Sequence, residues 1–383
     1  MIYLDHNATS PLRPEAAAAV LRALEIGGNP SSVHAAGRAA RKLIEDAREA
    51  VAEFADAAAG EIIFTSGGAE ANALALRGAI AGAAEAGQPI TRLLIQATAH
   101  ESARAVAASL AETAPELQVS EIPVNASARL DPEAFRSQLA SGEGRALASL
   151  IYVNNETGVV EDIPSLATRI RAETNALVHV DAVSSGYCPI RFREWDVDYL
   201  SLSAHKIGGA QGTGALIVKN GAPLAPLFNG FQEKRRGGTE NVSGIAGFGA
   251  AVRALLENRG EEAERLAAVR MKFEDALSAL GAIIFGKNAE RAPNTSCFAI
   301  PGLAAETALM ALDLDGICVS SGAACSSGKV GRSHVLKAMG VSDDLARCGL
   351  RVSFGWNSTQ HDADACIAAL EKLIARISAR KAA

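Results

Sequence analysis

Short apolar stretches alternate with longer amphipathic ones between about residues 11 and 220 of this 383-residue chain. Residues 61–65 and 147–153 are rich in apolar and β-branched residues and have the length of buried strands. The segments between such stretches carry apolar residues at helical spacing. Strands that alternate with helices are typical of a mainly parallel sheet with helices on both faces. We therefore predict an α/β fold for this region.

A different order of elements follows residue 241. The pattern predicts two helical stretches, then strand, helix, strand and a final helix, at about residues 242–256, 261–280, 294–300, 303–312, 349–354 and after 360. This mixture indicates a smaller α+β domain whose boundary lies in the helices at 242–280. We predict a large domain of residues 13–258, and a small domain formed by residues 1–12 and 259–383.

Composition narrows the class of protein. Hydrophobic residues make up 49% of the chain and charged residues 21%, as in a soluble globular enzyme. The net charge of -6 argues against direct nucleic-acid binding, although residues 234–236 form a small basic patch. The N-terminus does not resemble a secretion signal, and no apolar run approaches the ~18 residues of a membrane helix. We predict a cytoplasmic protein without membrane contact.

Two polar residues stand at the ends of successive predicted strands. Asp181 follows the apolar residues 176–180, and Lys206 comes just after the apolar strand that ends near Ser203. Ligands of α/β sheets bind at the carboxyl ends of strands, so both side chains are expected at one site. A surface lysine and a helix-capping aspartate are the alternatives, because most charged side chains are solvated.

The paired acid and lysine suit pyridoxal 5'-phosphate. The lysine would form a Schiff base with the cofactor, and the acid would keep the pyridine nitrogen protonated so that the ring accepts electrons. Ser203 and His205, on either side of Ala204, are able to hold a phosphate.

The turn at residues 66–68 is a candidate for that phosphate. A strand breaks at these residues, and a helical pattern begins at about Ala69. Unpaired backbone N–H groups at a helix N-terminus attract anions. A plain tight turn before a helix is the alternative.

Cys325 differs from the other five cysteines of the chain, which have the pattern of core or helix residues. It lies among small, polar and glycine residues, a composition typical of an exposed segment. Basic residues nearby in the sequence favour its thiolate, which is the nucleophilic form. No two cysteines have zinc-ribbon spacing, so we expect free thiols and no metal site.

Together these motifs resemble the cysteine desulfurases, class V of the fold-type-I pyridoxal-phosphate enzymes, and in particular the group that includes the housekeeping and nitrogen-fixation types. The resemblance runs nearly end to end and rests on YLDHNAT at 3–9, GNPSSVH at 28–34, FTSGG at 64–68, NNE at 154–156, HVD at 179–181, SAHK at 203–206, RGGTEN at 236–241, SSGAAC at 320–325 and LRVS at 350–353.

The resemblance implies a role for each candidate residue. Lys206 would be the Schiff-base lysine, Asp181 the partner of the pyridine nitrogen, and His100 the group that stacks on the ring and moves protons; a core or capping histidine is the alternative. Cys325 would be the nucleophile that carries a persulfide. The cofactor would also be held by Ser203, His205, Gly68, Ala69, Asn155, Ser184 and, from the partner subunit of a homodimer, Thr239.

Arg351 would grip the carboxylate of L-cysteine with help from Asn155, because a planar guanidinium binds a carboxylate through two parallel hydrogen bonds. A structural ion pair is the alternative for an arginine in an apolar strand. Two positions depart from the family pattern: Ala69 stands where a threonine usually binds the phosphate, and Ser184 where a glutamine usually reaches the phenolic oxygen of the cofactor.

These residues predict conversion of L-cysteine to L-alanine with a persulfide on Cys325, and transfer of the sulfur to an acceptor such as an iron–sulfur scaffold protein. Two alternatives stay open. A related class V enzyme would act on selenocysteine, cysteine sulfinate or another amino acid, as the departures at Ala69 and Ser184 suggest. A protein that only docks such scaffolds would keep the fold with little turnover.

Overall fold

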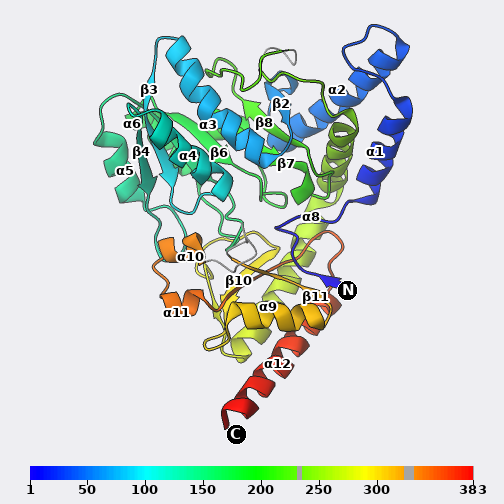
Figure 1. The fold of residues 1–383 in the computed structure, drawn as a ribbon, viewed down its shortest axis with the longest axis vertical. Helices are drawn as coiled ribbons and strands as arrows, with labels where there is room; N and C mark the ends of the chain where they lie inside the picture. The colour runs from blue at the N-terminus through cyan, green and yellow to red at the C-terminus, as the bar shows by residue number, and fades with distance from the viewer. Residues whose placement is uncertain (231–234, 323–331, 383) are drawn as a thin grey trace.

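A seven-stranded sheet forms the upper part of the molecule in Figure 1. The computed structural model describes residues 1–230, 235–322 and 332–382. Among the described strands of this sheet only β8 runs antiparallel to its neighbours, which confirms the predicted mainly parallel α/β fold. In spatial order the strands are β2 (Ile62–Thr65), β8 (Gly214–Val218), β7 (Tyr199–Ser203), β6 (Leu177–Asp181), β5 (Arg145–Ile151), β3 (Ile90–Gln96) and β4 (Gln118–Ile122).

Helices cover both faces of this sheet. They are α1 (Pro14–Ile26), α2 (Ala35–Ala55), α3 (Gly68–Glu85), α4 (Glu101–Thr113), α5 (Pro132–Ala140), α6 (Ile163–Glu173) and the short α7 (Phe192–Trp195). Successive side chains of a strand point to opposite faces. On β6, Leu177 packs in the core beneath α3 and α4, whereas Val178 and Val180 pack in the core on the other face. His179 and Asp181 therefore point to the α3 side.

A smaller antiparallel sheet lies below, in the order β12-β13-β10-β9, and a parallel pair β1-β11 lies beside it. Its strands are β9 (Ile283–Ile284), β10 (Thr295–Ala299), β12 (Ser320–Ser321) and β13 (Gly349–Ser353), and the pair is β1 (Ile2–Tyr3) with β11 (Ile317–Cys318). The accompanying helices are α9 (Ala305–Leu314), α10 (His334–Ala338), α11 (Asp343–Ala346) and α12 (Gln360–Ala382). This part has the predicted α+β character.

One continuous helix, α8 (Val242–Ala279), runs from the large sheet to the small one. The prediction of two separate stretches at 242–256 and 261–280 was wrong, because Gly260 continues the helix instead of breaking it. Residues such as Phe248 belong to the core of the large sheet, and residues such as Phe273 to that of the small sheet. The division at residue 258 stays a prediction.

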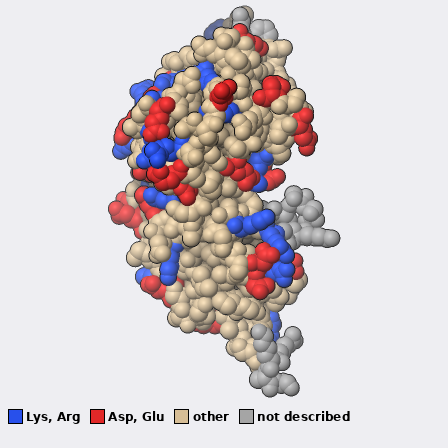
Figure 2. Space-filling model, turned by 90° about the vertical axis from the view of Figure 1, so that its left-hand side faces the viewer, with Lys and Arg blue, Asp and Glu red and all other residues tan. Residues whose placement is uncertain are grey.

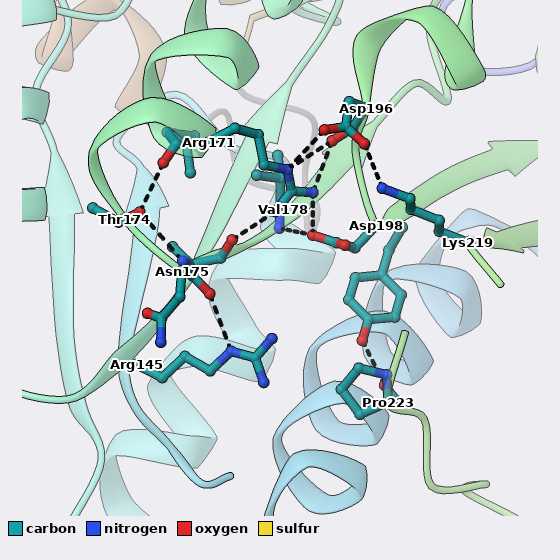
Figure 3. Close-up of polar contacts among 12 residues, drawn as sticks. Arg145, Arg171, Thr174, Asn175, Val178, Asp196, Asp198, Lys219 and Pro223 are labelled. Atoms are coloured by element: carbon teal, nitrogen blue, oxygen red, sulfur yellow. Dashed lines mark hydrogen bonds and ion pairs between the residues drawn. The ribbon is translucent and has the colours of Figure 1, made fainter. Parts of the chain in front are cut away.

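A cluster of charged residues fixes the ends of the central strands that lie away from the predicted site (Figure 3). Arg171 at the end of α6 forms ion pairs with Asp196 and Asp198 at N···O distances of 3.3 and 2.8 Å. Asp198 also accepts a hydrogen bond of 2.7 Å from the backbone N–H of Val178, and Lys219 pairs with Asp196. These contacts hold the starts of β6 and β7 and the end of β8 together.

Acidic and basic side chains are interspersed on the face drawn in Figure 2. No described helix is long and apolar enough to cross a membrane. The five described cysteines are free thiols, and the described residues contain no cluster of metal-binding side chains. Four of these cysteines are buried, but Cys318 is only partly buried on a short strand and so departs from the predicted core or helix position.

Candidate active site

A cavity of about 290 Å³ opens where β6 and β7 end and α3 begins. The predicted residues brought together in its wall are Gly68, Ala69, His100, Asn155, Asp181, Ser184, Ser203, His205 and Lys206. They come from segments far apart in the sequence, because the carboxyl ends of neighbouring parallel strands meet at one edge of the sheet. Asn72, Ser102, Ile151 and Val183 complete the wall.

Asp181 is the last residue of β6 and is buried, with 5% of its surface exposed. One carboxylate oxygen accepts a hydrogen bond of 2.8 Å from the amide of Asn72, and the other accepts one of 3.0 Å from the backbone N–H of Val183. Asn72 also donates to Ser102 at 3.0 Å. The acid is therefore oriented by fixed donors and does not cap a helix.

Lys206 follows β7 by one 3-10 turn and is part-buried in the cavity wall. Its ammonium group donates to the backbone carbonyl of Asn7 and, at 3.0 Å, to that of Ala8. Burial and the positive charge of Arg351 lower the pKa of Lys206 to about 8. A surface lysine is therefore ruled out, and this amine loses its proton more readily than an ordinary lysine.

The start of α3 forms an anion cradle beside these residues. Gly67 precedes the helix with a φ of 154°, a conformation that L side chains rarely adopt, and a Cβ there would meet no atom within 4 Å. The first N–H groups of a helix have no partner within it. Ser203 faces the same cavity, and its buried hydroxyl has no hydrogen-bond partner among the described residues.

Two histidines line the cavity. His100 caps α4: its ring nitrogen accepts from the backbone N–H of Ser102 at 3.1 Å, so the capping alternative and the cavity position both apply. The ring of His205 lies 3.1 Å from the hydroxyl of Thr9. Loss of hydration lowers the pKa of both, that of His205 to about 4, so both rings are neutral near pH 7.

Arg351 lies in the middle of β13, next to the cavity wall and outside it. Its guanidinium donates to the carbonyl of Asn155 at 3.0 Å and pairs with Asp5 at 2.7 Å, so the structural ion pair left open by the sequence is present. Arg351 is close enough to lower the pKa values of Lys206 and His100.

Thr239, like Arg351, does not line this cavity, and the position of Cys325 is not described. Thr239 is exposed on a segment fixed at both ends by ion pairs, Arg236 with Glu70 at 2.8 Å and Glu240 with Arg41 at 3.0 Å. Cys325 lies outside the described residues, as do the residues around it from 323 to 331.

The sequence prediction gave no role to the N-terminal segment, residues 5–9. Asp5 pairs with Arg351. The carbonyls of Asn7 and Ala8 accept hydrogen bonds from the ammonium group of Lys206, and the hydroxyl of Thr9 contacts the ring of His205. The side chain of Asn7 donates to the carbonyl of Asn155 at 3.0 Å. The motif at 3–9 was a signal, but its contacts involve residues about 150 to 350 positions away, which no local pattern indicates.

Glu156, in the motif at 154–156, also received no role from the sequence. It is buried, accepts a hydrogen bond of 2.5 Å from Ser333, and its carboxylate would be 2.4 Å from a Cβ at Gly322. Burial raises the pKa of Glu156 to about 7, although Ser333 and Arg351 oppose the shift. This acid packs against the residues on either side of the segment that contains Cys325.

Comparison with known proteins agrees with this geometry. The class V aminotransferase family matches residues 2–366. The chain belongs to this family. It is 40% identical to a cysteine desulfurase of Cereibacter sphaeroides over 99% of this chain and 97% of that one. It is 35% identical to the cysteine desulfurase IscS of Dictyoglomus turgidum over 98% and 95%.

Among solved structures, a NifS-like protein of Rickettsia africae superimposes with a TM-score of 0.87 at 34% identity, covering 98% of this chain and 99% of that chain. The fold is therefore that of the fold-type-I pyridoxal-phosphate enzymes, and the chain is an enzyme of the class V kind.

The residues of the cavity fit the cofactor of this family. The orphaned hydroxyl of Ser203 and the open start of α3 suit a phosphate, Lys206 suits an aldehyde, and Asp181 suits a protonated ring nitrogen. The short side chains of Ala69 and Ser184 supply neither a threonine hydroxyl nor a glutamine amide, so fewer side-chain hydrogen bonds are available.

Proposed function

We propose that this protein is a pyridoxal-phosphate-dependent cysteine desulfurase that converts L-cysteine to L-alanine and takes the sulfur onto Cys325 as a persulfide. The observation that carries the proposal is the convergence of Lys206 and Asp181 on one cavity beside the unpartnered hydroxyl of Ser203. Relatives named cysteine desulfurase, at up to 40% identity over nearly the whole chain, support the choice of substrate.

The cofactor would be held by Lys206 through its aldehyde, by Asp181 through its ring nitrogen, and by Ser203, His205 and the start of α3 through its phosphate. When bound, it would withdraw electrons from the Cα of the amino acid. The lowered pKa of Lys206, about 8, lets this amine take the Cα proton near neutral pH once it is released. Neutral His100 is placed in the same wall to accept or donate a proton.

The substrate carboxylate would bind Arg351, whose remaining N–H groups suit a second oxygen acceptor. The thiolate of Cys325 would then attack the sulfur of the bound substrate. Alanine would then leave without the sulfur, and the persulfide would pass to an acceptor, such as an iron–sulfur scaffold protein. The relative named IscS supports this destination.

The working unit would be a homodimer. Thr239 is exposed, and its segment is fixed by two ion pairs, which suits a residue that binds the phosphate of a second subunit.

The test is release of products by purified protein loaded with pyridoxal phosphate. L-cysteine with a reductant should give sulfide and alanine in equal amounts, and the variants Cys325→Ala and Lys206→Ala should lose at least 99% of this activity. Each loss has a different signature: Cys325→Ala should keep the yellow colour, whereas Lys206→Ala should not hold the cofactor covalently. Full desulfurase activity of Cys325→Ala would overturn the persulfide step.

A related activity has one observation in its favour. Ala69 and Ser184 leave the cavity wall with short side chains where the family usually has longer polar ones. Turnover of selenocysteine and cysteine sulfinate should be compared with that of cysteine. If the protein clearly prefers either compound, that compound is the substrate in place of cysteine, and the proposed roles of Lys206 and Asp181 are unchanged.

A further inference from the structure

The ion pair between Asp5 and Arg351 joins residues 346 positions apart in the sequence. The side chain of Arg351 is 3% exposed and that of Asp5 is 19% exposed. The guanidinium proposed to receive the substrate carboxylate is therefore already paired with a carboxylate of the protein.

The three guanidinium nitrogens of Arg351 differ in their hydrogen bonds. Nη1 donates to the carbonyl of Asn155 at 3.0 Å, and Nη2 donates to Oδ1 of Asp5 at 2.7 Å. Nε is buried and has no hydrogen-bond partner among the described residues. Because Nη2 carries two hydrogens, Nε and Nη2 together offer two free donors to an incoming carboxylate while Asp5 stays in place.

The backbone of Asp5 is fixed beside Arg351. Its backbone forms a bridge with Ser353 of β13, two residues from Arg351. Its carbonyl accepts hydrogen bonds from the hydroxyl of Tyr3 at 3.1 Å and from the backbone N–H of Ala8 at 3.0 Å. The anchored backbone and the ion pair together keep the carboxylate of Asp5 next to the proposed binding site for the substrate carboxylate.

We propose that Asp5 is a positioning and specificity residue for the substrate: it orients Arg351 and, by repelling a second carboxylate on the same guanidinium, keeps amino acids weakly bound so that product leaves. This inference rests on the proposed function. Two like charges about 5 Å apart at a partly buried site repel strongly enough to weaken binding by roughly tenfold to a hundredfold.

The experiment is calorimetric titration of the cofactor-loaded protein with L-alanine. In Asp5→Asn, the amide oxygen still accepts from Nη2 but the charge is gone, so L-alanine should bind at least tenfold more tightly. The KM for L-cysteine should fall together with kcat, because alanine leaves slowly. Asp5→Glu keeps the charge and should bind L-alanine no more than threefold more tightly than the wild type.

Glu274→Gln is the matched control, because Glu274 on α8 forms an ion pair of similar burial with Arg291 at 2.6 Å, and neither residue lines the cavity. It should leave L-alanine affinity unchanged. If Asp5→Asn does not yield folded protein, Asp5→Ser removes the same charge and decides the question in the same titration.

Weaker or unchanged binding of L-alanine by the charge-removing variant would overturn the inference, as would equal tightening by Asp5→Glu. Wild-type protein that binds L-alanine but makes none from cysteine would remove the proposed reaction and leave the result on Asp5 standing. Wild-type protein that does not bind L-alanine would overturn the role of Arg351, and with it that of Asp5.

Discussion

Lys206 should set the pH dependence of cofactor capture by the apoprotein. Only the neutral amine attacks an aldehyde, and the pKa of Lys206 is lowered to about 8 by burial and by Arg351. The rate at which the apoprotein takes up pyridoxal phosphate should therefore rise with pH and level off above about 8. Stopped-flow absorbance between pH 6 and 10 measures this rate.

The control is the reaction of pyridoxal phosphate with Nα-acetyl-lysine. The rate of this reaction depends on pH through an ordinary lysine amine and through the titration of pyridoxal phosphate itself, and the second effect is shared with the protein. A midpoint for the protein near that of this model amine would show that the site does not lower the pKa of Lys206.

Glu156 should make stability depend on pH in the direction opposite to that of an ion-paired acid. Burial raises its pKa from 4.5 to about 7. The folded chain therefore holds this proton more tightly than the unfolded chain, and its contribution to stability falls as pH rises from about 4.5 to 7. Glu156→Gln removes the effect. The free energy of unfolding of this variant minus that of the wild type should therefore be about 2–3 kcal/mol higher at pH 8 than at pH 5, because only the wild type loses stability over this range.

Urea unfolding at both pH values provides the comparison. Ser333→Ala is the matched control, because it removes the hydrogen bond to Glu156 but keeps the carboxylate. That hydrogen bond lowers the pKa of Glu156, so this variant should show a pH dependence at least as large as that of the wild type. Parallel stability curves for Glu156→Gln and wild type would contradict the raised pKa.

Sequence reasoning succeeded at residues that end strands. Asp181 and Lys206 were found because an apolar run that ends in a charge is a local pattern, and parallel strands bring such ends together. Asp5 and Asn72 were not found, because their roles lie in contacts with Arg351 and Asp181 that only the folded chain creates. The roles that the resemblance assigns to all of these site residues remain predictions.

At the scale of elements, α8 contains an avoidable weakness. Gly260 is exposed in the middle of this 38-residue helix, and a Cβ there would meet no atom within 4 Å. Gly260→Ala should raise the free energy of unfolding by about 0.5–1 kcal/mol, because alanine loses less backbone entropy in a helix. Chemical denaturation measures the gain. Gly249→Ala is the contrasting variant, since its Cβ would lie 2.6 Å from Ala47, and it should destabilise.

The charged cluster at the starts of the strands should matter through Asp198 rather than Asp196. Asp198→Ala leaves the buried N–H of Val178 without its acceptor and removes one of the two ion pairs of Arg171, and should cost about 2–4 kcal/mol. Asp196 is exposed and adopts a left-handed φ of 53°, which asparagine tolerates, so Asp196→Asn should cost less than 1 kcal/mol. Thermal unfolding followed by circular dichroism ranks the two, and equal losses would contradict the assignment.

The order of strands and helices was predictable because hydrophobic periodicity is a local property. The continuity of α8 through Gly260 was not predictable, because the local sequence around a glycine is the same whether the helix breaks there or continues. Packing decides: residues on both sides of Gly260 belong to cores that a single straight helix connects.

For the whole molecule, the proposed homodimer predicts that inactive subunits complement each other. Lys206→Ala removes the cofactor lysine, and Thr239→Ala removes one phosphate hydrogen bond, worth about 1.5–3 kcal/mol when the acceptor is charged. A mixed dimer has one site with both residues intact. Refolding the two variants together should therefore restore desulfurase activity at cofactor concentrations too low to support Thr239→Ala alone.

The control mixes Lys206→Ala with the double variant Lys206→Ala/Thr239→Ala, which leaves no intact site and should stay inactive. Recovery no greater than the sum of the separate variants would show that Thr239 serves no neighbouring subunit.

The threading of the N-terminus has a consequence for biosynthesis. Asn7 is synthesised 199 residues before its partner Lys206, and Asp5 is synthesised 346 residues before its partner Arg351. Translation proceeds at roughly 5–20 residues per second, so these first residues wait many seconds for their partners. A nascent chain cannot bring Lys206, Arg351 and the carbonyls of residues 7 and 8 together until Arg351 has been made, so the proposed capture of an aldehyde would wait until then.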